Sequence, residues 1–123
     1  YMENLKTFTF TGMDGIEKMK GIMENFRTNP PKEICGLKLC KLWDVSKGTI
    51  TDVGDGNVSK LDLPSSNVLK FELENHAWIA IRPSGTEPKV KFYYGVKGAS
   101  LEDAEQKSAQ MGKEILAMID KML

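Results

Sequence analysis

The chain is poor in cysteine, histidine and long apolar runs, and each shortage excludes a class of protein. Its 123 residues contain two cysteines and one histidine, too few for a four-ligand zinc site of these residue types. No apolar run approaches the roughly 18 residues that a membrane span needs. The first residues also lack the basic and then apolar layout of a secretory signal peptide. We therefore expect no membrane partner, no metal ligands and a cytoplasmic location.

Net charge is lacking as well, because 17 basic residues balance 17 acidic ones. A neutral chain has no overall attraction for nucleic acid or an anionic membrane, so we expect no nucleic-acid partner. Any anion site must then be a local cluster of donors. With 41% hydrophobic and 28% charged residues, the composition is that of a soluble globular domain with a single core.

The two cysteines are predicted to be reduced thiols. Residues 33–43 read as one strand, with Leu37, Leu39 and Trp43 on one face. On such a strand Cys35 and Cys40 lie five positions apart and point to opposite faces, which disfavours a disulfide between them. Free thiols are typical of a reducing cytosol.

Two amphipathic helices are predicted from apolar residues that recur at spacings of three and four. The first covers residues 13–26 and ends before Pro30, and the second runs from residue 101 to the C-terminus. Capping boxes are expected at Thr11 with Asp14 and at Ser100 with Asp103. The apolar stripe of the first helix consists of Met13, Ile16, Met19, Ile22, Met23 and Phe26.

Alternation of apolar and polar residues predicts the strands. They are expected at residues 5–10, 33–43, 68–73, 77–81 and 90–96, with a reversal at 74–76 and a brief strand at 49–52 inside the irregular segment 44–66. Strands linked by hairpins beside separate helices indicate an α+β fold rather than a doubly wound sheet. We expect an antiparallel sheet of about four strands with helices packed on one side.

The segment between the last two strands, Arg82-Pro83-Ser84-Gly85-Thr86-Glu87-Pro88-Lys89 (the Arg82 loop), has the residues that an anion site needs. Arg82 offers a planar fork that matches two phosphate oxygens. Ser84 and Thr86 each bring a hydroxyl donor. Gly85 allows the backbone to approach a ligand closely, and Lys89 adds a mobile positive charge.

The same composition also fits an ordinary turn, since Ser, Gly, Thr and Pro are all common there. The loop is not a P-loop, because it lacks Gly-Lys-Ser/Thr and no helix follows it. Glu87 weighs against an anion site unless its carboxylate turns away or pairs with a base. From the residues alone, both interpretations stay open.

Over residues 68–96 the sequence resembles the α-D-phosphohexomutase superfamily, which includes phosphoglucomutases and phosphomannomutases. The resemblance is carried by the Arg82 loop, by Trp78-Ile79-Ala80-Ile81 before it and by Val90-Lys91-Phe92-Tyr93-Tyr94 after it. The order of helices and strands is similar to the family's fourth and last domain, which has a TATA-box-binding-protein-like fold. On this basis residues 11–123 are predicted to be a phosphate-binding C-terminal domain, and residues 1–10 a linker or hinge from a preceding domain.

The resemblance implies a division of labour among four domains around one cleft. The first domain carries a phosphorylated serine, the second holds Mg²⁺, the third reads the sugar and the fourth grips the substrate's phosphate. Carried over by position, Arg82, Ser84, Gly85 and Thr86 contact phosphate and Lys89 supports them, with a weaker assignment for Lys91. No Ser-His-Asn-Pro-like segment and no metal loop are present in this sequence, so the chain alone is expected to be inactive, with no catalytic residue and no cofactor of its own.

The expected partners are therefore a hexose 1-phosphate, 6-phosphate or bisphosphate and the three other domains of the parent. The ending Lys91-Phe92-Tyr93-Tyr94 looks more like bacterial phosphoglucomutases than mannose enzymes, but the sugar itself is not specified. Two alternatives stay open. One is a stand-alone module that binds a phosphorylated ligand without mutase activity. The other is a nucleic-acid-binding sheet with Trp78, Phe92, Tyr93 and Tyr94 as stacking platforms.

Overall fold

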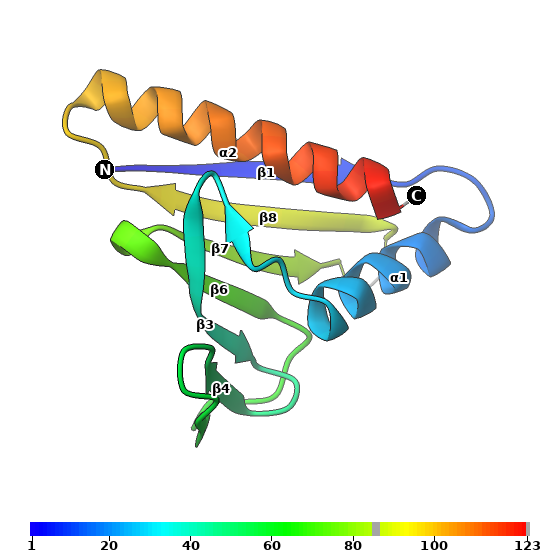
Figure 1. Cartoon of the computed structure of the whole chain (residues 1–123). Coiled ribbons are helices and arrows are strands. Elements are labelled where there is room, and N and C mark those ends of the chain that lie inside the picture. The colour runs from blue at the N-terminus through cyan, green and yellow to red at the C-terminus, as the bar shows by residue number, and fades with distance from the viewer. Residues whose placement is uncertain (85–86, 123) are drawn as a thin grey trace.

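The protein is described by a computed structural model that covers residues 1–84 and 87–122. Within these residues an eight-stranded antiparallel sheet carries two α-helices on one face (Figure 1). The strand order is β1-β8-β7-β6-β3-β4-β5, and β2 pairs with β3 off this path. The predicted α+β class is confirmed, although the sheet has more strands than the four expected. The elements are β1 (Met2–Thr9), α1 (Gly15–Thr28), β2 (Glu33–Ile34), β3 (Leu37–Asp44), β4 (Thr49–Asp52), β5 (Val58–Lys60), β6 (Leu69–Leu73), η1 (Glu74–His76), β7 (Trp78–Pro83), β8 (Lys89–Val96) and α2 (Leu101–Met122).

The three central strands β6, β7 and β8 follow the two-residue alternation of their sequences. Their apolar positions face the helices and form the core, where Phe26 of α1 packs against Phe71 and Phe92 with ring centroids 6.0 and 5.8 Å apart. Their other positions form the face opposite α1 and α2, which we call the open face. Its side chains from β3, β6, β7 and β8 include Trp43, Lys70, Glu72, Trp78, Ala80, Arg82, Lys89, Lys91 and Tyr93.

Strand β1 forms one edge of the sheet and is longer than the extended stretch predicted at residues 5–10. It pairs with β8 from Met2 opposite Val96 to Thr9 opposite Lys89, and Phe8 meets Phe92 edge to face at 5.4 Å. Residues 2–9 of the segment 1–10 are therefore part of the sheet in this structure. Their role as a linker to a preceding domain stays a prediction.

The prediction of one strand over residues 33–43 was wrong in two respects. A tight turn at Cys35 and Gly36, which have φ angles of 55° and 74°, separates β2 from β3. A β-bulge between Leu39 and Lys41 then shifts the register against β6 and reverses the alternation. As a result Leu39 is buried on the helix side, whereas Trp43 lies on the open face, where its ring is 5.1 Å from Lys70 Nζ.

Both cysteines are free thiols. They do not lie on opposite faces of one strand, however, as the sequence argument assumed. Cys35 sits at the turn rather than within a strand, and it is half-buried. Burial, together with the nearby Glu114 carboxylate, raises the pKa of the Cys35 thiol to about 12. Cys40 is exposed on β3. Cys35 is therefore a protonated, weakly nucleophilic thiol at neutral pH.

The segment at residues 44–66 contains the predicted strand β4, and β5 pairs with it although its sequence gave no alternation signal. The reversal at 74–76 is confirmed, with Asn75 and His76 both at positive φ. The second capping box is present in part, because Ser100 Oγ accepts a hydrogen bond from Asp103 N–H at 3.1 Å. The first was wrong: α1 begins after Asp14, which makes no side-chain capping bond, and Met13 is fully exposed.

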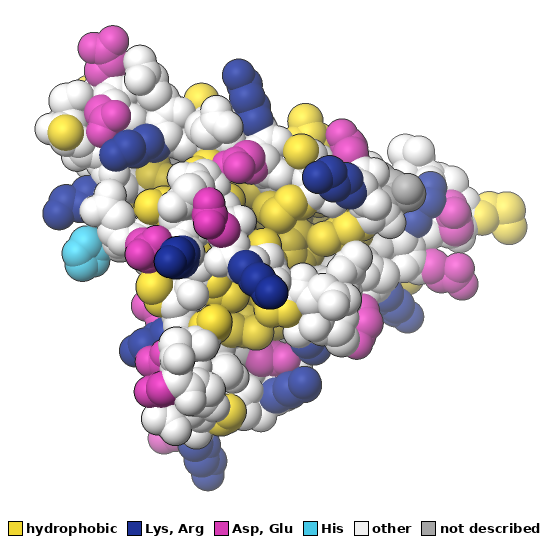
Figure 2. Space-filling view, in the orientation of Figure 1, with side chains coloured by type: hydrophobic (Ala, Val, Ile, Leu, Met, Phe, Trp, Pro, Cys, Tyr) yellow, Lys and Arg dark blue, Asp and Glu magenta, His cyan; other side chains and the backbone are white. Residues whose placement is uncertain are grey.

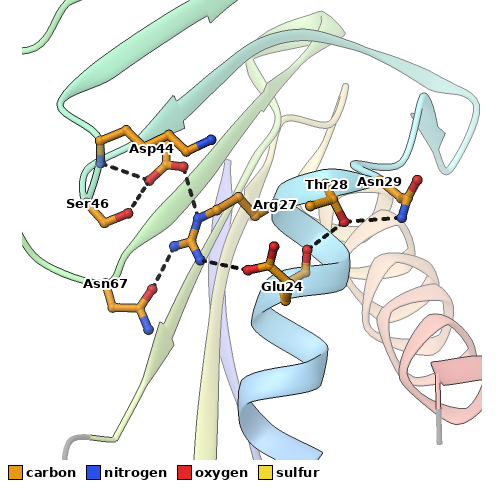
Figure 3. Close-up of polar contacts among 8 residues, drawn as sticks. Glu24, Arg27, Thr28, Asn29, Asp44, Ser46 and Asn67 are labelled. Atoms are coloured by element: carbon orange, nitrogen blue, oxygen red, sulfur yellow. Dashed lines mark hydrogen bonds and ion pairs between the residues drawn. The ribbon is translucent and has the colours of Figure 1, made fainter.

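The C-terminal end of α1 is fastened to the sheet by a polar network (Figure 3). Arg27 Nε donates to Asp44 Oδ2 at 3.0 Å, its Nη2 donates to Asn67 Oδ1 at 2.7 Å, and its Nη1 lies 3.8 Å from Glu24 Oε2. Asp44, only 4% exposed, also accepts from Ser46 Oγ at 2.7 Å. A buried carboxylate with this many donors is stabilised in its charged form. The network therefore ties α1 to the end of β3.

Replacing Asp44 with asparagine should lower the free energy of unfolding by about 1 kcal/mol at neutral pH, because the charge that faces Arg27 is lost while an acceptor for Ser46 remains. Burial by itself would raise the pKa of Asp44, but hydrogen bonds from Ser46 and Lys47 and the Arg27 guanidinium outweigh it, so the pKa is lowered from 3.8. The stabilisation is then present above pH 3.8 and is lost as the pH falls through the folded-state value.

The gap between wild type and D44N, measured by denaturant unfolding at a series of pH values, should therefore stay constant near neutrality and close on acidification. The exposed Asp62 provides a matched control, and D62N should leave both the stability and its pH dependence unchanged. A gap that persists unchanged in acid would contradict the ionic role of Asp44.

Candidate anion-binding site

The bend between β7 and β8 is held by backbone hydrogen bonds at its base. Ser84 N–H donates to Lys89 C=O and Lys89 N–H donates to Glu87 C=O, each at 2.8 Å. Ser84 Oγ accepts from Glu87 N–H at 3.2 Å. Pro83 is opposite Val90 in the register, so the paired strands run directly into the bend. These bonds set the directions in which the side chains of the bend leave the backbone.

The start of α1 packs against the same bend and fixes its position. Phe10 N–H donates to Pro88 C=O at 2.8 Å, which continues the pairing of β1 with β8. At Gly15 an added Cβ would lie 2.8 Å from Phe10 O and 3.0 Å from Pro88 Cβ. Glycine is therefore required where α1 begins. The helix, fastened to β3 at its other end, supports the bend from the core side.

Three basic side chains gather beside the bend on the open face. Arg82 and Lys91 are direct cross-strand partners in β7 and β8, and Lys89 is two residues before Lys91 on the same face. Together with Pro83, Ser84, Glu87 and Tyr93 they line an open pocket of about 330 Å³. Like charges directly opposite each other on a sheet repel, so a bound anion would relieve the arrangement. The pocket is rich in charged side chains rather than in apolar ones, which suits an anion.

The guanidinium of Arg82 is exposed and forms no ion pair with any residue in 1–84 or 87–122. Lys89 differs, because its Nζ lies 3.0 Å from Glu87 Oε2. The carboxylate of Glu87 thus pairs with a base, which is one of the two conditions that the sequence placed on an anion site here.

The structure brings together three of the five predicted site residues: Arg82, Ser84 and Lys89 all line the pocket. Gly85 and Thr86 lie outside the described residues. Lys91, the weaker assignment from the sequence, also lines the pocket. Tyr93 was not among the predicted site residues, but it alternates with the buried Phe92 and Tyr94 in the sequence, and this alternation puts it on the same face as Lys91.

Charged side chains lie on both faces of the sheet. On the face that carries the helices, basic and acidic side chains are interspersed (Figure 2). The basic cluster of the pocket belongs to the opposite, open face.

Phe92 and Tyr94 are 0% and 2% exposed, so neither can stack on a nucleic-acid base. Trp78 and Tyr93 alone remain of the four proposed stacking platforms.

In the described part of the chain, no group of three His, Cys, Asp or Glu side chains is arranged to hold a metal ion. The Mg²⁺ that the resemblance implies for the parent therefore has no fitting ligand set among these residues. No helix in the described ranges is long and apolar enough to cross a membrane.

Fold and pocket together define an α+β domain that presents a basic bend on one face of an antiparallel sheet. Residues 13–118 match the family model described as "Phosphoglucomutase/phosphomannomutase, C-terminal domain". The chain belongs to this family.

Several phosphoglucomutases are similar to this chain. The chain is 39% identical over 98 residues to "Phosphoglucomutase" of Staphylococcus saprophyticus, a match that covers 80% of this chain and 18% of the relative. It is 39% identical over 105 residues to "Phosphoglucomutase" of Staphylococcus aureus strain MRSA252, covering 85% and 19%. It is 43% identical over 93 residues to "Phosphoglucomutase" of Staphylococcus epidermidis strain RP62A, covering 76% and 17%. The chain thus spans less than a fifth of the length of these relatives.

Proposed function

We propose that the Arg82 loop binds the phosphate of a sugar phosphate, and that this chain is the substrate-phosphate-binding domain of a phosphohexomutase. The parent would interconvert a hexose 1-phosphate and a hexose 6-phosphate. The observation that carries the proposal is the pocket in which Arg82, Lys89 and Lys91 converge beside a braced bend. Membership in the phosphoglucomutase/phosphomannomutase family supports it.

In the proposed reaction a phosphoserine on another domain gives its phosphoryl group to one hydroxyl of the sugar phosphate. The resulting bisphosphosugar turns over, and its other phosphate returns to the serine. The pocket holds whichever phosphate is not reacting, so both orientations use one anchor. Binding energy from this remote group then positions the reacting end.

The parts that perform the chemistry are proposed to lie outside this chain. The phosphoserine and the Mg²⁺ that would assist phosphoryl transfer belong to other domains of the parent. The three other domains of the parent are the proposed partners of this chain, and residues 1–10 are the proposed hinge toward them. The chain alone should have no mutase activity. Two free cysteines fit a reducing compartment such as the cytoplasm.

The test is a ¹H–¹⁵N NMR titration of the 123-residue chain with a hexose bisphosphate, inorganic phosphate and single-stranded DNA. Only the phosphates should shift signals, and the shifts should be confined to residues 82–91. We expect a Kd of about 1 mM or weaker, since a few charge-assisted hydrogen bonds must offset the cost of association. Shifts scattered over the surface, or DNA binding on the open face, would refute the phosphate site.

A further inference from the structure

The basic pocket contains one carboxylate, and its placement has a functional consequence. Glu87 lines the pocket with Arg82, Lys89 and Lys91, and its Oε2 lies 3.0 Å from Lys89 Nζ. The two side chains are 58% and 38% exposed, so water competes for both charges. Ion pairs with this exposure are held weakly.

The bend does not depend on this ion pair. Glu87 N–H is bonded to Ser84 Oγ, and Glu87 C=O is bonded to Lys89 N–H. Ser84 N–H is bonded to Lys89 C=O. All three bonds include a backbone group of Glu87 or Lys89, and none involves the carboxylate or the ammonium. The two charged ends can therefore separate by side-chain rotation while the backbone of the bend stays in place.

The charges of the pocket match a phosphate monoester. Three cations and the Glu87 carboxylate give a formal charge of +2, and a phosphate monoester near neutral pH carries a charge of roughly −1.5 to −2. Within residues 1–84 and 87–122, Lys89 is the only one of the three cations that has an anionic partner. An anion that binds Arg82 and Lys91 needs only to take Lys89 from Glu87 to engage all three.

We propose that Glu87 is a displaceable counter-ion of the phosphate site, an inference that rests on the proposed function. In the absence of phosphate its carboxylate forms an ion pair with the Lys89 ammonium. When phosphate binds, the ammonium transfers to the phosphate oxygens and the carboxylate turns away. The device suits a reaction in which the grip must be released when the bisphosphosugar turns over and again when the product leaves, because Glu87 recaptures Lys89 each time a phosphate departs.

The test compares phosphate affinities of the 123-residue chain carrying E87Q, K89M or both substitutions. Glutamine keeps the shape of Glu87 and removes the charge, so E87Q should bind inorganic phosphate about two- to fivefold more tightly than wild type, the range expected from an exposed ion pair. In the K89M background, where no ammonium is available to hold, the gain from E87Q should largely disappear. Such non-additivity is the mark of a direct coupling. Titrations are run at constant ionic strength and followed by ¹H–¹⁵N NMR.

Glu105, exposed on α2 on the other face of the sheet, provides the matched control. E105Q changes the net charge equally and should leave the affinity at the wild-type value. In wild type the ¹³C signal of the Glu87 carboxylate should move with the same midpoint as the signals of Arg82. A carboxylate signal that does not move at saturation would overturn the inference.

Failure of the inference is distinguishable from failure of the proposed function. If wild type binds phosphate at residues 82–91 but E87Q binds no more tightly than E105Q, the counter-ion role falls and the phosphate site stands. If the full gain persists in the K89M background, Glu87 acts by simple repulsion and the displacement idea falls. If phosphate at tens of millimolar shifts no signal of residues 82–91 in wild type or E87Q, both proposals fall.

Discussion

Replacing Phe92 with alanine should lower the free energy of unfolding by about 3–5 kcal/mol, the usual cost of emptying a large aromatic site in a core. Phe92 is 0% exposed at the centre of β8, and it joins three elements. Its ring meets Phe8 of β1 at 5.4 Å and Phe26 of α1 at 5.8 Å. The cavity left by alanine would loosen the edge strand and the helix that supports the bend.

The measurement is equilibrium unfolding in urea followed by circular dichroism. Lys91→Ala offers a control in the same strand, because its side chain is exposed on the open face and the change should stay within about 0.5 kcal/mol. Phe92→Leu retains most of the volume and should cost less than about 1.5 kcal/mol. A loss below about 1 kcal/mol for Phe92→Ala would contradict the packing described for this core.

In a full-length parent enzyme, Arg82→Ala should lower kcat/KM by about ten- to a hundredfold or more, which corresponds to a loss of about 1.4–2.7 kcal/mol in transition-state stabilisation. The reason is that Arg82 is the fork-shaped cation of the pocket and has no ion pair within the described residues. Steady-state kinetics with a hexose 1-phosphate provides the measurement.

Arg82→Lys separates charge from shape. It keeps the positive charge but loses the planar fork, so its efficiency should lie between those of wild type and Arg82→Ala. Lys60 of β5 is exposed and remote in the sheet order, and Lys60→Ala should keep normal efficiency. If Arg82→Ala also retained normal efficiency, the anchor role of Arg82 would be excluded.

The site was predictable from sequence to the extent that it is local. The Arg82 loop lies between two strands whose alternation is regular, and Ser84, Gly85 and Thr86 carried the family resemblance. Lys91 and Tyr93 alternate with Val90, Phe92 and Tyr94 in the sequence, so the pattern alone puts these two side chains on one face. The sequence indicated only that Glu87 must turn away or pair with a base. Its pairing with Lys89 could not be predicted, because the choice among several nearby bases depends on side-chain geometry.

Errors in the predicted fold occurred where a local pattern was interrupted by one residue. Cys35-Gly36 reads as strand because cysteine rarely marks a left-handed turn, yet both residues adopt positive φ there. The bulge at Leu39 and Lys41 adds one residue to β3 and moves Trp43 to the opposite face. A prediction from strict two-residue alternation does not account for an inserted residue, so it assigns every later residue of the strand to the wrong face.

The sequence by itself determined the family, the α+β class, both helices and the loop that carries the basic site, because these features depend on residues close together in the chain. Only the tertiary structure decided that β1 joins β8 at the sheet edge, that Arg82 is opposite Lys91, and that Arg27 reaches Asp44. Each of these depends on strand register or on packing between distant segments. Periodicity fixes which face a side chain occupies but leaves its partner across the sheet undetermined.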